Sequence, residues 1–235
     1  MNTRTPNTRT GRSRPPRPER PSRDDRTERP ERLSREERKE ATRRAIINAA
    51  LTLLEERSFS ALSLREVTRA AHIVPAAFYR HFESMDALGL VLIDESFRAL
   101  RETLRDARAG RVDPSRVIES SVEVLVDSVA SRREHWRFIN RERFSGMTVL
   151  RYAIRTEIRL ITSELATDLA RFPAFNEWSA EDLNVLAGLF VNAMIVNAEA
   201  IDDAPDAETL AEIKQVAIKQ LRMIAVAAGG WRSKP

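Results

Sequence analysis

The stretch LSLREVTRAAHIVPAAFYRHF, residues 62–82, decides the fold that we predict for this chain. Ser63 and Glu66 have the spacing of a capping box, in which two side chains satisfy free backbone N–H groups at a helix start. Pro75 suits the first turn of a second helix, where the N–H group that proline lacks would have no partner. The four residues 71–74 separate these helix starts. The stretch therefore predicts two short helices joined by a tight turn.

A further helix is predicted before this stretch, over residues 33–57, where Ser34 and Glu37 repeat the capping-box spacing. Three short helices with such a turn have helix-turn-helix proportions, although the spacing also fits a helical hairpin with solvated polar faces. His72 stands at the turn position where glycine is most common, and histidine tolerates a positive φ better than most residues. Phe78 and Phe82, four residues apart, are predicted to face inward.

The second helix of such a unit lies in the major groove of DNA, with its N-terminal residues facing the base edges. Ala76 and Ala77 are small enough to approach thymine methyl groups, and the Tyr79 hydroxyl can donate to a phosphate oxygen. Arginines and backbone N–H groups at neighbouring helix starts also suit phosphates. We therefore expect contacts with double-stranded DNA from Thr42, Arg43, Arg44, Ser63, Arg65, Ala76, Ala77, Tyr79, Arg80 and His81.

Helical patterns continue to the end of the chain and predict an all-α protein of nine helices with no convincing strand. The chain divides into a tail (1–32), a helix-turn-helix domain (33–83) and a larger helical domain (84–235). Beyond the first three helices we expect six more, over residues 84–109, 113–129, 134–143, 147–171, 179–202 and 206–228.

The tail is rich in arginine and proline and has no apolar side chain except Met1. Residues 1–30 hold nine arginines against four acidic residues, so most of the net charge of +4 comes from this part of the chain. A segment of this kind buries too little surface to offset its ordering entropy, and we expect it to be disordered. It is either a solvated extension or a basic arm attracted to DNA phosphates.

Composition excludes several classes of function. The chain has no cysteine and three histidines, which leaves no disulfide framework, thiolate nucleophile or cysteine-based zinc site. It also lacks a glycine-rich phosphate loop, a G-x-S-x-G motif and metal-binding His/Glu spacing, so we expect no catalytic residues and no metal. With no run of 18 apolar residues and no secretory signal, we expect a cytoplasmic protein that does not enter a membrane.

The segments LSLREV (62–67) and FYRHF (78–82) closely resemble the DNA-binding domain of the TetR family. The resemblance covers residues 34–82 strongly and the rest of the chain by its number of helices. It implies a dimeric transcriptional repressor with an N-terminal three-helix DNA domain. It also implies a variable helical ligand domain that dimerises through its last two helices.

A narrower resemblance extends beyond the DNA domain. The segments ERSF (56–59), SLREV (63–67), FYRHF (78–82), LGL (88–90), DES (94–96) and RER (141–143) are similar to repressors of unsaturated-fatty-acid synthesis. The tail and Phe144 depart from this resemblance. It implies control of desaturase and other fatty-acid genes. The implied effector is a long-chain acyl thioester of coenzyme A or acyl carrier protein, with no bound cofactor.

An acyl chain needs a long apolar tunnel between the helices of the second domain. Arginines would suit the phosphates of the nucleotide part, although each of these side chains also fits an ordinary core or surface role. The expected ligand contacts are Val91, Phe97, Val122, Val126, Phe138, Arg141, Arg143 and Ile158.

The last two helices are apolar on more than one side, which indicates that a second surface buries them. A homodimer supplies that surface, although a helix fully buried in one protomer would give the same pattern. The expected dimer contacts are Leu183, Leu186, Gly188, Phe190, Ala193, Met194, Ile213, Ala217 and Leu221.

Three other interpretations remain open from the sequence. A TetR-family repressor of a drug-efflux or catabolic operon would have the same fold and another ligand. An enzyme would need an acid/base cluster, for which the surroundings of His135 are the nearest candidate. A purely structural helical adaptor would leave the two capped short helices of residues 62–82 without a role.

Overall fold

The computed structural model describes residues 34–109 and 116–233. The tail and the predicted helix start at Asp113 and Pro114 lie outside these residues. Within the described residues the chain forms nine α-helices, one 3₁₀ turn and no strand, which confirms the predicted all-α class. The elements are α1 (Arg35–Leu54), η1 (Phe59–Ala61), α2 (Leu64–Ala70), α3 (Pro75–Phe78), α4 (Met85–Ala109), α5 (Val117–Ser131), α6 (Arg133–Glu142), α7 (Thr148–Leu169), α8 (Ala180–Asp202) and α9 (Ala207–Gly230).

The first two helices begin at capping boxes. Ser34 and Glu37 form a complete capping box at α1, and Ser63 and Glu66 form another at α2. Each box satisfies two backbone N–H groups that the helix itself leaves without partners. The turn between α2 and α3 contains His72 at φ 55°, a left-handed conformation that the sequence pattern anticipated.

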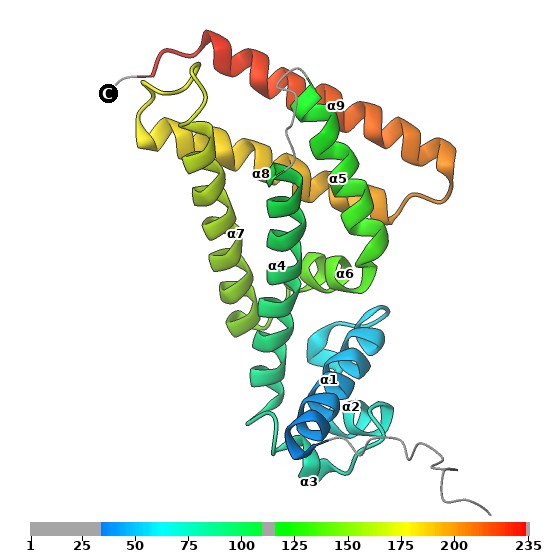
Figure 1. The fold of residues 1–235 in the computed structure, drawn as a ribbon. Helices are drawn as coiled ribbons and strands as arrows, with labels where there is room; N and C mark the ends of the chain where they lie inside the picture. The colour runs from blue at the N-terminus through cyan, green and yellow to red at the C-terminus, as the bar shows by residue number, and fades with distance from the viewer. Residues whose placement is uncertain (1–33, 110–115, 234–235) are drawn as a thin grey trace, which may run out of the picture.

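The molecule is elongated, with α1, α2 and α3 at one end and α8 and α9 at the other (Figure 1). α1, α2 and α3 form the lower unit, and α4 leads from it along α7 toward α8 and α9. The short α6 lies between the lower unit and the α5–α8 region. The lower unit is therefore connected to the end of the molecule formed by α8 and α9 by two routes, α4 and α6.

One apolar cluster runs across the border between the two predicted domains. It joins buried residues of the lower unit, such as Ile46 and Phe78, to Leu92 on α4 and to Leu150 and Ile154 on α7. The chain changes direction at the predicted domain boundary near residue 83, but the apolar packing continues across this boundary. A continuous core of this kind transmits displacements between its parts, because interiors are close-packed.

Candidate DNA-binding surface and effector domain

Two buried phenylalanines hold α3 against the lower unit. Phe78 and Phe82 are buried, and their ring centroids lie 5.5 Å apart. Tyr79 stands between them in the sequence and turns outward, with 60 % of its surface exposed. Ala76 and Arg80 are also exposed. α3 and the turn that follows it therefore present a small side chain, a phenol and a guanidinium to the outside of the molecule.

The residues of α1 and α2 that are predicted to contact DNA differ in their exposure and in whether their side chains already bond other groups of the protein. Arg65 and Arg44 are exposed, and Arg44 meets only the exposed Glu40 on its own helix. Ser63 is exposed, but its hydroxyl is engaged with Glu66 as the helix cap. Thr42 is half-buried and donates its hydroxyl to the carbonyl of Arg38.

Arg43 contacts the protein itself. Its Nη1 lies 3.3 Å from Oε1 of Glu95 on α4, and its guanidinium stands 5.3 Å from the centre of the Phe82 ring. These contacts tie α1 to α4 and to the helix-turn-helix core, and the phosphate contact of Arg43, whose side chain is 31 % exposed, stays a prediction.

A broad hollow of about 570 Å³ opens between the first turns of α1 and the turn after α3. Burial lowers the pKa of the half-buried His81, and the nearby charges of Lys39, Arg43 and Arg80 lower it further. Sequence reasoning missed Lys39, as well as Val74, which is exposed just before α3. The hollow is lined by Glu36, Glu37, Lys39, Glu40, Arg43, Arg80 and His81.

The residues expected to line an acyl tunnel fall into different apolar clusters. Phe97 and Phe138 belong to the large cluster shared with the lower unit, and Val91 and Ile158 pack against it. Val126 packs against a second cluster around Trp136, and Val122 lies in a third with Ala217 and Leu221. The sequence identified these side chains as interior but could not place them around one cavity.

A small polar cavity of about 10 Å³ lies where α4, α5 and α6 meet. Its lining includes Ser96, Ser128 and His135. The Ser96 hydroxyl donates to the carbonyl of Leu92, so it accepts from Nδ1 of His135 at 2.8 Å. Trp136 Nε1 donates to the hydroxyl of Ser128. Burial lowers the pKa of His135, which favours the neutral imidazole.

Arg141 and Arg143, expected to meet ligand phosphates, contact other parts of the chain. Arg141 donates to three backbone carbonyls of the lower unit, at Leu54, Glu55 and Arg57. Arg143 pairs with Glu199 on α8 at 3.0 Å. Both guanidiniums are therefore engaged inside the protomer, because the carbonyls and the carboxylate are brought together by elements far apart in the sequence.

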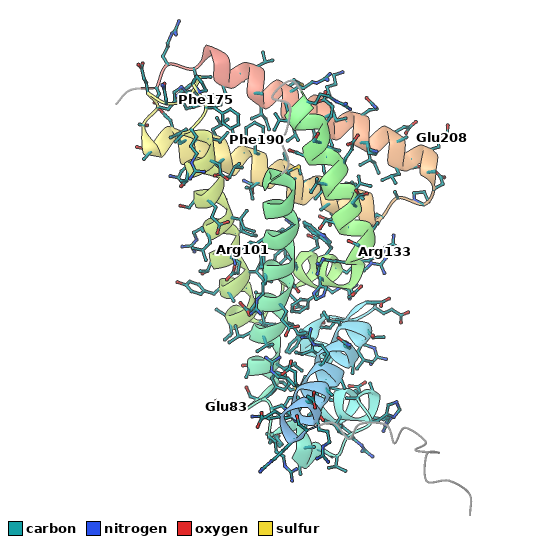
Figure 2. All side chains as sticks on the ribbon, viewed as in Figure 1. Glu83, Arg101, Arg133, Phe175, Phe190 and Glu208 are labelled. Atoms are coloured by element: carbon teal, nitrogen blue, oxygen red, sulfur yellow. The ribbon has the colours of Figure 1, made fainter. Side chains whose placement is uncertain are left out.

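Ion pairs join the helices of the larger domain. Arg101 on α4, labelled in Figure 2, lies 2.6 Å from Glu157 on α7. Arg133, also labelled there, and Arg137 both bond the buried carboxylate of Asp202, at 2.6 and 2.7 Å. No group of three or more potential metal ligands is found among the described residues.

The apolar stripe assigned from the sequence to the dimer interface lies inside the protomer. Leu183, Leu186, Ala217 and Leu221 are buried, and Gly188 is half-buried. The remaining expected contacts are partly buried and pack against clusters of the same protomer: Phe190, Ala193, Met194 and Ile213. This stripe packs against α5 and α7 of the same protomer.

A second apolar face on α8 and α9 is exposed. It consists of Val185, Leu189 and Val196 on α8 with Val216, Met223 and Val226 on α9. Among the described residues, α8 is the one helix long and apolar enough to cross a membrane, with 28 % of its apolar window buried in the protomer. Two apolar faces, one inward and one outward, account for that composition.

The chain is similar to known proteins in its sequence near the N-terminus and in its fold. Residues 46–90 match the family model described as bacterial regulatory proteins, tetR family. A TetR-like transcriptional regulator from Rhodococcus sp. RHA1 is similar in structure, with a TM-score of 0.64 and 16 % sequence identity. The match covers 83 % of this chain and 99 % of that one.

Two other solved structures share the fold. The fatty acid degradation regulator FadR from Bacillus halodurans matches with a TM-score of 0.61 and 13 % identity, over 82 % of this chain and 97 % of its own. The multidrug binding protein EbrR, complexed with imidazole, matches with a TM-score of 0.55 and 15 % identity, over 76 % and 93 %. At these low sequence identities the similarity concerns the fold alone.

Proposed function

We propose that this transcriptional regulator of the TetR family is a cytoplasmic repressor of fatty-acid genes, desaturase genes among them. In this proposal a homodimer binds a near-palindromic operator, and long-chain acyl thioesters of coenzyme A or acyl carrier protein tune its affinity. The observation that carries the proposal is the segment formed by α3 and the turn that follows it, which is anchored by Phe78 and Phe82 and presents Ala76, Tyr79 and Arg80 outward. This arrangement suits insertion into a major groove.

The exposed face of α8 and α9 supports the dimer. Contiguous apolar side chains on a protein surface mark an interaction site, and a second copy would cover Leu189, Val196 and Val216 with the same face. A two-fold dimer would also present two α3 helices, whose separation must match successive major grooves. We therefore propose the exposed face as the interface in place of the buried stripe.

The lipid effector is supported by the resemblance of the segments LGL (88–90), DES (94–96) and RER (141–143), beyond the DNA domain, to repressors of unsaturated-fatty-acid synthesis. FadR is a fatty acid regulator and EbrR binds multiple drugs, so the shared fold fits either class of ligand. Two carboxylates that are buried in the described part of the larger domain contact groups of the chain itself: Asp202 bonds two arginines, and Oε1 of Glu142 accepts from the Phe59 N–H while its Oε2 has no hydrogen-bond partner. A cationic drug would have to compete with two arginines for Asp202, whereas an acyl chain would enter by separating apolar side chains.

The proposal is tested by fluorescence anisotropy on labelled palindromic DNA from upstream of this gene and of nearby desaturase or fatty-acid-synthesis genes. Salt is held fixed, because phosphate contacts make affinity steeply salt-dependent. Tyr79→Ala is expected to weaken specific binding by about tenfold or more, since it removes an outward contact of α3. Tyr152→Ala, an equally exposed tyrosine on α7, is the matched control.

Oleoyl and palmitoyl thioesters are then titrated separately. Specific binding that the two thioesters shift differently would support the lipid-sensing repressor. Specific binding indifferent to both would favour a repressor of a drug-efflux or catabolic operon, and a thermal-shift panel of drugs would identify its ligand class. Equal affinity of Tyr79→Ala and the unmodified protein would contradict the assigned surface.

A further inference from the structure

We infer that Arg141 and Glu142, the last two residues of α6, are positioning residues that fix the DNA-binding unit on the larger domain. Both side chains bond backbone groups of the connection between α1 and α2. We call these two side chains and the backbone groups that they bond the α6 clamp. The clamp itself follows from the contacts, and its consequence for DNA binding rests on the proposed function.

Arg141 caps the end of α1 from another domain. A helix leaves its last carbonyls without internal partners, and the negative end of its dipole attracts a cation. α1 has no basic residue in its last turn, so the helix does not supply this cation itself. Nη1 of Arg141 donates to the carbonyls of Leu54 at 2.9 Å and Arg57 at 2.6 Å, and Nη2 reaches Glu55 at 3.3 Å. Three carbonyls are thus held by one planar group.

Glu142 holds the next part of the same connection. The residue is fully buried, and its Oε1 accepts from the backbone N–H of Phe59 at 2.7 Å. A buried carboxylate that loses its donor is costly, so this bond strongly favours one arrangement. The Phe59 ring lies 6.3 Å from the ring of Phe138 on α6 and against Gly89 on α4. The turn η1 therefore sits between α4 and α6.

α6 is fixed to α8 as well. Arg133 and Arg137, in the first half of α6, bond Asp202, the last residue of α8, and Arg143, next to the clamp residue Glu142, bonds Glu199. Because α8 carries part of the exposed apolar face, α6 links the proposed dimer interface to the DNA-binding unit. Orientation of α3 relative to that interface then depends on the α6 clamp as well as on α4.

Hydrogen exchange tests the clamp without DNA or effector. In Arg141→Lys the charge remains, but a single ammonium cannot reach three carbonyls in the geometry of a guanidinium. Amides of residues 55–62 are expected to exchange at least about fivefold faster, while those of α8 and α9 keep their rates. Arg155→Lys, at an exposed position on α7, is the matched control. Unchanged exchange over residues 55–62 would overturn the inference.

Distance measurements separate positioning from simple stability. The chain has no cysteine, so spin labels can be placed cleanly at Arg69→Cys on α2 and Ser163→Cys on α7. Labelled protein is diluted into unlabelled protein, so that one protomer of a pair carries labels. Glu142→Gln and Arg141→Lys are expected to broaden the α2–α7 distance distribution with unchanged helix content by circular dichroism.

A distribution as narrow as that of the unmodified protein would overturn the positioning role. Operator affinity, measured on the same variants, is expected to fall with the broadening. If no DNA is bound by any form, the proposed function fails, while the distances still decide whether the α6 clamp orients the two parts.

Discussion

Gly89 on α4 packs closely against Phe59 of η1 and Leu150 of α7. A Cβ at this position would lie 2.8 Å from Cδ2 of Leu150 and 2.9 Å from Cζ of Phe59. Both neighbours are buried and have little room to move. The position needs glycine because of this contact between α4, α7 and η1, and not because of its backbone conformation.

We expect Gly89→Ala to lower the free energy of unfolding by about 1–2 kcal/mol, since overpacking outweighs the better helix propensity of alanine. Urea denaturation measures the change. Gly229→Ala on α9 is the control, because a Cβ there meets nothing within 4 Å, and it should be neutral or slightly stabilising. Equal effects of the two substitutions would contradict the steric explanation.

Local residue patterns predicted local structure well. Both capping boxes and the positive φ of His72 depend on neighbours within four residues, so the sequence contains their cause. Arg141 and Glu142 depend on partners more than 80 residues away, and no spacing rule connects them. Sequence reasoning therefore treated Arg141 as a phosphate ligand, and structure was needed to show its three carbonyl partners.

At the scale of helices, the sequence predicted which elements form but not which face meets which neighbour. The sequence predicts helices over residues 179–202 and 206–228, and the structure has α8 and α9 there, with side-chain caps at Ser179 and Asp206. Each helix has two apolar faces, and the periodicity of the sequence identifies both but does not indicate which one is buried within the protomer. The pattern therefore predicts the face of Leu186 and Leu221 as the interface, whereas in the structure this face is buried in the protomer and the face of Leu189 is exposed.

The contact between α4 and α6 through Ser96 and His135 predicts a dependence of stability on pH. Burial lowers the pKa of His135 below its ordinary value of 6.5, so the unfolded chain binds this proton more readily than the folded one. Stability is therefore complete above pH 6.5 and declines as the pH falls through and below that value. Protonation would also place a cation beside the buried Ser96.

We expect His135→Gln to reduce the loss of unfolding free energy between about pH 7.5 and about pH 5.5. Denaturant titrations at several pH values measure this slope. If the variant keeps the full pH dependence of the unmodified protein, another group carries it.

At the scale of the whole molecule, the exposed face of α8 and α9 predicts association. Leu189→Asp would place a charge in the proposed interface, and we expect it to weaken the dimer by at least about tenfold. Sedimentation equilibrium measures the change, and circular dichroism checks that the protomer stays folded. Leu160→Asp on α7 is the matched control, since Leu160 is 48 % exposed and Leu189 is 51 % exposed. Dissociation by both variants, or by neither, would contradict the assigned face.

The small α6 also constrains how such a protein can diverge or be recombined. It has ten residues and contacts fixed partners at both ends, Asp202 near its start and Phe59 at its finish. One inserted residue would turn one end by about 100° relative to the other, so both sets of contacts could not persist together. The partners of Arg141 and Glu142 are backbone groups of residues 54–59, so a chimera that exchanges residues 33–83 can keep these contacts only if its connection between α1 and α2 has the same length and conformation.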